Sequence, residues 1–190
     1  MGIIAKWHLK DIITIAIISV LFGFIFVFSD WLYTLVYSIL SPLGLGPFVG
    51  EGLFGLWCMG GPIAFMVVRL PGSSLISEIL GAFLESGLGG QFGVTALFAG
   101  FFQGLGSELG FASFKYKRFD IKSLLLAAVF STVITFGSAL FIHGYIKLKL
   151  GMMLALFLTR LCSNLIFSVG LVSLINKLVV RAQLFETRKS

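Results

Sequence analysis

Long apolar runs, separated by basic residues and by Gly/Pro clusters, constrain this chain more than any other feature. The first run, residues 12–28, contains no charged residue and is long enough to cross the hydrocarbon core of a membrane. The mean hydropathy of +1.06, with 58% hydrophobic and 12% charged residues, excludes an ordinary soluble domain. The sequence therefore predicts an integral membrane protein.

The length of the chain sets the number of spans. At about 20 residues per span, the 190 residues allow about six helices and no additional soluble domain. We expect one all-α transmembrane domain over residues 1–190, with spans at 12–28, 52–68, 74–88, 94–114, 123–142 and 152–178. An outer connector covers 30–51, with a short separate helix at 31–40. Gly60-Gly61-Pro62 should kink the second span.

Basic residues predict the orientation of the spans. With both termini cytoplasmic, eleven basic residues fall on the inner side and two on the outer side. The inner residues are Lys6, Lys10, Arg69, Lys115, Lys117, Arg118, Lys122, Lys177, Arg181, Arg188 and Lys189, and the outer ones are Lys147 and Lys149. The positive-inside rule favours this topology, and it explains the net charge of +6 without nucleic acid.

Several alternative readings of the sequence are disfavoured. No small-residue cleavage site follows residues 12–28, so we read this run as a retained helix and not as a signal peptide. Cys58 and Cys162 lie inside apolar runs, and we expect both to be small buried hydrophobic residues. The sequence has no Walker A motif, no metal-ligand spacing and no catalytic triad, so we expect no cofactor, no metal and no enzymatic activity.

Acidic residues within the apolar hairpin 69–118 provide the functional-site hypothesis. A carboxylate at membrane depth is costly unless it faces a cavity, a partner or a ligand. Glu78 and Glu85 are seven residues apart, so they lie on one helix face. The alternative is structural: Arg160 pairs with Glu78 or Glu85, and Glu108 pairs with a basic residue at the inner rim. Ser73 or Ser74 is expected to cap the third span.

The remaining polar residues suggest binding of a cationic aromatic ligand. We predict an outward-facing pocket in which Glu85, with Glu51 and Glu78, compensates the positive charge and Trp57 stacks on the ring. The amides of Gln103 and Asn164 offer donors and acceptors for the edge of a heterocycle.

Small residues form a stripe on the first span. Ala16, Ser19 and Gly23 share one helix face, which allows close helix approach in lipid. The stripe either packs within the bundle or docks another membrane subunit, and we predict docking.

The hairpin also resembles a known family. The similarity is clearest over residues 51–118. It is carried by Gly55-Leu56-Trp57, Arg69-Leu70-Pro71-Gly72, Glu78, Glu85, Gly90-Gln91-Phe92-Gly93 and Gln103-Gly104-Leu105-Gly106-Ser107-Glu108-Leu109. These motifs are similar to the YkoE family, substrate-binding S components of energy-coupling factor (ECF) vitamin transporters.

The resemblance implies a subunit in the bacterial cell membrane that captures thiamine or its hydroxymethylpyrimidine precursor (HMP) from outside. Its partners would be a membrane T component and two cytoplasmic ATPase subunits or domains. The rival transporter reading is a stand-alone secondary permease, which would usually show inverted repeats that we do not find. A small intramembrane enzyme is the other rival, but the sequence offers no nucleophile–base pair on one face.

Overall fold

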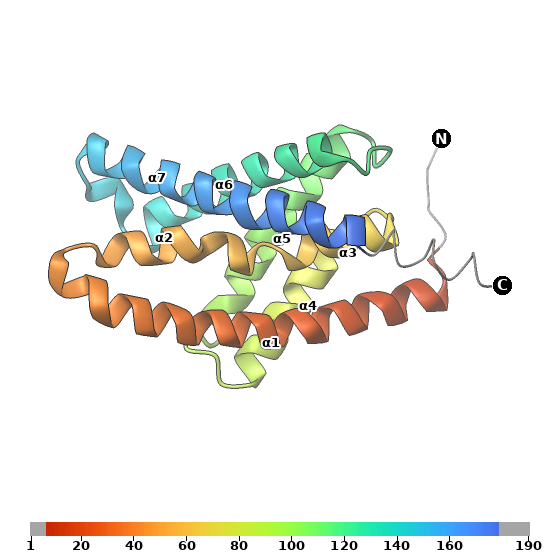
Figure 1. Ribbon diagram of the computed structural model, residues 1–190, viewed down its shortest axis with the longest axis horizontal. Coiled ribbons are helices and arrows are strands. Elements are labelled where there is room, and N and C mark those ends of the chain that lie inside the picture. Colours follow the sequence, from red (N-terminus) through yellow and green to blue (C-terminus); the bar gives the residue numbers. More distant parts are fainter. Residues whose placement is uncertain (1–6, 179–190) are drawn as a thin grey trace.

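The computed structural model describes residues 7–178, and these residues form an all-helical bundle (Figure 1). The helices are α1 (Leu9–Leu40), η1 (Ser41–Leu43), α2 (Gly46–Trp57), α3 (Gly60–Val68), α4 (Ser73–Gly87), α5 (Thr95–Ser113), α6 (Ile121–Ile142), η2 (Tyr145–Lys147), α7 (Leu150–Asn164) and the π-helical η3 (Leu165–Leu171).

These elements group into the six expected membrane helices. The pair α2–α3 forms one interrupted helix, and α7 with η3 continues as one helix to Leu178. Four of the six helices are long and apolar enough to cross a membrane by length and composition, and α4 and α5 complete the set. Figure 1 shows α4 and α5 crossing the other helices obliquely.

The first helix is longer than expected and absorbs much of the predicted connector 30–51. No Gly or Pro interrupts residues 31–40, so α1 continues without a break to Leu40. Pro42 is the first helix breaker, and it lies in the 3₁₀ turn η1 that follows α1. The connection between α1 and α2 is therefore only Ser41 to Leu45, and the predicted separate helix at 31–40 is wrong.

The second membrane helix breaks next to Gly60-Gly61-Pro62, and its neighbour compensates for the break. Pro62 lacks the N–H that would bond the carbonyl of Cys58 four residues earlier, and α2 ends at Trp57. The hydroxyl of Ser168, in the π-helical η3, donates to this carbonyl at 3.1 Å. Two irregular helix segments thus satisfy each other inside the bundle, as buried backbone groups require.

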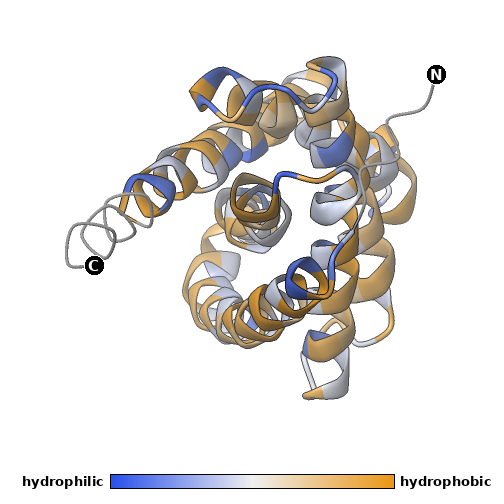
Figure 2. Ribbon diagram, turned by 90° about the vertical axis from the view of Figure 1, so that its right-hand side faces the viewer, coloured by the Kyte–Doolittle hydropathy of each residue, from blue (hydrophilic) through white to orange (hydrophobic). Residues whose placement is uncertain are grey.

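One helix lies in the middle of the bundle. Figure 2, viewed along the long axis, shows a central helix surrounded by the others. Burial identifies it as α3, in which Gly60, Gly61, Pro62, Ile63, Ala64, Phe65 and Met66 are all buried. The aromatic ring of Phe65 stacks on Phe111 of α5, with ring centroids 4.0 Å apart.

Glycines on α5 bring it close to two neighbouring helices. Gly100 and Gly104 face α4, and Gly106 and Gly110 face α6. A Cβ at Gly110 would lie 2.3 Å from the Cα of Ala127, so only glycine allows this backbone contact. Such close packing is how helices associate without a hydrophobic driving force in lipid.

The predicted docking stripe is largely internal, so the docking prediction is wrong for two of its three residues. Ser19 is buried, and its hydroxyl lies 3.4 Å from that of Ser77 on α4. A Cβ at Gly23 would lie 2.6 Å from the Cβ of Leu84. These two residues let α1 pack on α4, whereas Ala16 is exposed on the outer face of α1.

The helix ends are consistent with the predicted grouping of basic residues. In Figure 1 the start of α1, the end of α3, the α5–α6 loop and the last described helical turn lie at one end of the bundle. These segments carry Lys10, Arg69, Lys115, Lys117, Arg118, Lys122 and Lys177. The predicted inner residues Lys6, Arg181, Arg188 and Lys189 lie outside the described residues.

Two separate glycine substitutions test the packing of α5 on α6. Gly110→Ala should lower the free energy of unfolding by about 1–3 kcal/mol, because the new methyl group meets the backbone of Ala127. Gly137→Ala on α6 is the matched control, since its Cβ would meet nothing within 4 Å. Unfolding in detergent should show the control unchanged or slightly more stable, and equal effects of both substitutions would contradict the packing.

Candidate functional site

Asp30 of α1 joins three parts of the chain. Its side chain is 2% exposed, and Oδ1 accepts a hydrogen bond from Nε1 of Trp57 at 3.2 Å. Oδ2 accepts from the backbone N–H of Gln91 at 3.0 Å, and the side-chain amide of Gln91 donates to the Asp30 carbonyl at 3.1 Å. The end of α2 and the 88–93 turn are therefore both fixed to α1 by Asp30.

Glu85 of α4 lies against this aspartate. The two carboxyl groups are within hydrogen-bonding reach, and both border Gly90. A Cβ at Gly90 would lie 2.8 Å from Cγ of Glu85 and 2.9 Å from Oδ2 of Asp30. Glu85 is 3% exposed, and its Oε1 has no partner among the described residues. Two adjacent buried carboxyl groups need a shared proton or a cation beside them.

Three aromatic rings, those of Trp57, Tyr33 and Phe92, pack against one another next to Asp30. The ring of Trp57 lies edge-on to Tyr33 and to Phe92, with centroid separations of 6.4 and 5.9 Å. Tyr33 and Phe92 are 5.7 Å apart. A hollow of about 420 Å³ lies on the other side of Asp30, between α1 and the 88–91 turn, and its lining includes Trp31 and Gln91 but none of these three rings. Carboxyl groups next to aromatic faces are suited to an organic cation.

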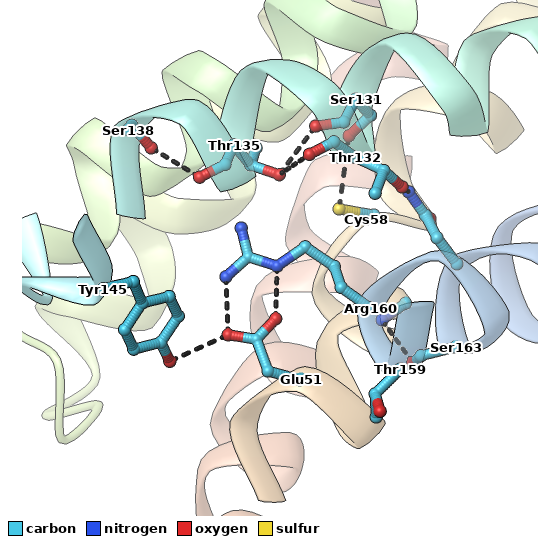
Figure 3. Close-up of polar contacts among 12 residues, drawn as sticks. Glu51, Cys58, Ser131, Thr132, Thr135, Ser138, Tyr145, Thr159, Arg160 and Ser163 are labelled. Atoms are coloured by element: carbon cyan, nitrogen blue, oxygen red, sulfur yellow. Dashed lines mark hydrogen bonds and ion pairs between the residues drawn. The ribbon is translucent and has the colours of Figure 1, made fainter. Parts of the chain in front are cut away.

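A second polar centre lies between α2, α6 and α7 (Figure 3). Arg160 donates to both carboxylate oxygens of Glu51, with Nη2 2.8 Å from Oε1. Tyr145, from the loop after α6, donates to the same carboxylate at 2.9 Å. The prediction that Arg160 pairs with Glu78 or Glu85 is wrong, because Glu51 on the facing helix is the closer acid.

The environment of this pair is apolar and aromatic. The guanidinium of Arg160 lies 4.3 Å from the ring centroid of Phe54 and 5.3 Å from that of Phe136. Burial, followed by the Glu51 carboxylate, raises the pKa of Tyr145, so its phenol remains a donor at neutral pH. The charge of Glu51 is thus compensated within the protein, unlike that of Glu85.

The other predicted binding residues are buried in the bundle. Glu78 is fully buried, and Oε1 accepts from the backbone N–H of Gly61 at 2.7 Å while Oε2 has no partner among the described residues. Asn164 donates to the Ala128 carbonyl and to Thr132 Oγ1, both at 3.1 Å, and its Oδ1 is likewise unpartnered. Gln103 is 6% exposed and so does not face lipid. Its amide makes no side-chain hydrogen bond within residues 7–178.

Glu108 has a structural role that differs from the prediction. Its carboxylate accepts from the backbone N–H groups of Gly72, Ser74 and Leu75, at 2.6, 3.1 and 3.3 Å. It therefore caps the N-terminus of α4 from a neighbouring helix, and it does not pair with a rim Lys or Arg. The hydroxyls of Ser73 and Ser74, expected to cap this helix, make no hydrogen bond among the described residues.

Sequence reasoning missed several residues of these centres. Asp30 was not predicted as a site residue, although an acid directly after an apolar run was a usable signal. Gln91, Tyr33 and Tyr145 were not singled out as site residues either. Trp31 is 77% exposed and lines the hollow beside Asp30, and Cys162 is exposed, contrary to the expectation of burial.

Comparisons with known proteins agree with this architecture. Residues 10–134 match the family described as ABC-type cobalt transport system, permease component. A relative from Bacillus subtilis (strain 168), the putative HMP/thiamine permease protein YkoE, is 32% identical over 159 residues, covering 84% of this chain and 77% of the relative. The chain belongs to the YkoE family.

A solved structure supports the same family at the level of fold. A crystal structure of an S component of an ECF transporter superimposes with a TM-score of 0.84 and 28% identity, covering 97% of this chain and 96% of the other. As a YkoE-family member, the chain is an S component with the predicted six-helix fold. It is a multi-pass cell-membrane transport protein and not an enzyme.

The capping role of Glu108 can be tested separately from ligand binding. Glu108→Ala should lower the free energy of unfolding by about 2–4 kcal/mol, because it leaves backbone N–H groups of α4 without an acceptor. Thermal unfolding in detergent measures the loss. Glu108→Gln retains an oxygen acceptor and should recover part of the stability. A Glu108→Ala variant as stable as the wild type would contradict the capping role.

Proposed function

We propose that this chain captures thiamine or HMP from the extracytoplasmic side and delivers it to an ATP-driven ECF importer. The observation that carries the proposal is the buried carboxyl pair of Asp30 and Glu85 beside the ring of Trp57. A positively charged heterocycle would supply the compensating charge that the pair lacks. The ring of the ligand would meet Trp57, Tyr33 or Phe92.

The other predicted residues complete the proposed site. Gln103 has an amide without a partner among the described residues, and it can bond the edge of a pyrimidine. Glu78 and Asn164 each present an unpartnered oxygen, which can accept from a ligand N–H group. Glu51 would act through its pair with Arg160.

The proposed orientation and partners follow from charge and family. Both termini would be cytoplasmic, because the basic helix ends gather at the end of the bundle where α1 begins. Asp30, in the proposed ligand site, lies about 32 Å from Leu9 along α1, which is close to the thickness of the hydrocarbon core of a membrane. A T component and two ATPase subunits or domains would drive transport. The name of the Bacillus subtilis relative and the S-component fold support this assignment.

Glu85 provides the direct test of the ligand site. Glu85→Gln keeps the shape of the side chain but removes its charge, and thiamine affinity should fall by about 2–4 kcal/mol. Titration calorimetry of the purified protein measures the change. Asp120→Asn, at the exposed N-cap of α6, is the control that removes an equal charge far from the site. A thiamine affinity of the Glu85→Gln variant within about threefold of that of the wild type would contradict the assignment of Glu85 to the ligand site.

Two substitutions on α1 test the one exposed residue of the small stripe. Ala16→Trp should leave ligand affinity unchanged but reduce ATP-dependent uptake by the full complex, because its bulk would keep a partner helix away. Gly23→Trp should instead destabilise the isolated protein, since Leu84 occupies the space. Normal uptake by the Ala16→Trp variant would exclude this part of α1 as the docking face.

A further inference from the structure

The hollow beside Asp30 opens on the outer surface of α1, and the proposed function makes no use of it. Its volume is about 420 Å³, and its walls are residues 27–35 of α1 and the turn 89–91. Figure 1 shows the turn between α4 and α5 on the side of α1 away from α2. The indole of Trp31, in the lining, is exposed. The hollow therefore faces the surrounding membrane and not the interior of the bundle.

The polar wall of the hollow consists of hydrogen-bond acceptors. Oδ2 of Asp30 lies on this side, because it accepts from the backbone N–H of Gln91 and borders Gly90. The hydroxyl of Thr34 donates its hydrogen to Oε1 of Gln91 at 2.9 Å, and both oxygens keep a free lone pair. Glu85 adds a second carboxyl group behind Asp30, and none of the described residues that line the hollow is basic. Such a wall favours a positively charged group with several N–H donors.

An apolar stripe on α1 leads to this hollow. Leu21, Phe24, Phe28 and Trp31 follow one another at intervals of three or four residues, and all four are exposed. The distance from Leu21 to Trp31 along the helix is about 15 Å, which is about half the thickness of the hydrocarbon core. Tryptophan is enriched at the level of the lipid headgroups. The stripe and the hollow together match one acyl chain and the headgroup above it.

We propose that the hollow binds the primary ammonium headgroup of a phospholipid such as phosphatidylethanolamine (PE), with an acyl chain along the stripe of α1. The ammonium would donate to Asp30 and to the oxygens of Thr34 and Gln91, against the indole of Trp31. Phosphatidylcholine (PC) has a cationic headgroup without N–H donors. Phosphatidylglycerol (PG) would bring a negative charge, without a cation, to a wall that contains carboxyl groups.

This lipid site goes beyond the proposed function and is compatible with it. Asp30 and Glu85 are two carboxyl groups, and a vitamin cation on the side of the Trp57 ring would compensate one of them. A lipid ammonium in the hollow would compensate the other from the opposite side of Asp30. Because Asp30 is 2% exposed, water screens this interaction only weakly.

Native mass spectrometry of the purified protein in detergent, titrated separately with PE, PC and PG of the same acyl chains, tests the site. Val27→Trp fills the hollow and should lower PE affinity about tenfold. Trp31→Ala should lower it about threefold. Phe141→Ala, near the end of α6, is the matched control, because Phe141 is 76% exposed and Trp31 77%. PG should bind the basic end of the bundle equally in every variant, and PC should bind the wild type more weakly than PE does.

A charge substitution and a soluble headgroup complete the test. Asp30→Asn should lower PE affinity about tenfold, whereas Asp120→Asn, which removes an equal charge at the N-cap of α6, should not change it. Glycerophosphoethanolamine, the same headgroup without acyl chains, should not bind measurably. Binding of this compound as tight as that of PE would overturn the assignment to a lipid.

Two further outcomes would overturn the site. One is PE affinity equal to that of the wild type in both Val27→Trp and Trp31→Ala, and the other is an equal loss of PE and PG. If Val27→Trp fails to fold, Trp31→Ala decides alone, because its exposed side chain can be removed without disturbing the core. None of these measurements involves the vitamin, so their failure would leave the proposed function standing.

Discussion

The cost of burying a carboxyl group in an apolar bundle governs this structure. Glu108 meets that cost with backbone N–H groups at the start of α4, and Glu51 meets it with Arg160 and Tyr145. Glu78 is half satisfied by the N–H of Gly61. Asp30 accepts from Trp57 and Gln91, whereas Glu85 has the Asp30 carboxyl group beside it and one oxygen without a partner among the described residues. The acid with the least internal compensation is thus the best candidate to meet a cation from outside.

Buried backbone groups also need hydrogen-bond partners, and this need explains how irregular backbone is tolerated inside the bundle. Pro62 leaves the Cys58 carbonyl without its helical partner, and Ser168 supplies a replacement from the π-helical segment. Ser163, one helix turn earlier, accepts from the Gly55 N–H at 2.9 Å. These bonds hold α2 at a defined height, and α2 carries both Glu51 and Trp57. The helix break and the two polar centres are therefore parts of one arrangement.

The sequence predicted the membrane class and the six helices well, because apolar run length and glycine spacing are local signals. It also named Glu85 and Trp57 as residues of one binding site, and this stays a prediction, because the contacts described connect the two side chains through Asp30. It could not predict pairing across helices: Glu51, Glu78 and Glu85 are equally plausible partners for Arg160 until helix rotation is known. The continuous α1 was not predicted, because residues 31–40 were assigned to a separate short helix within the outer connector, although they contain no helix breaker.

The central claim concerns where the positive charge of the ligand lies. An experimental structure of the purified protein with bound thiamine measures this most directly. We expect the ligand to contact the carboxyl groups of Asp30 and Glu85 and to pack on the ring of Trp57. Density for the ligand elsewhere, with the Asp30–Glu85 pair closed and unchanged, would contradict the account.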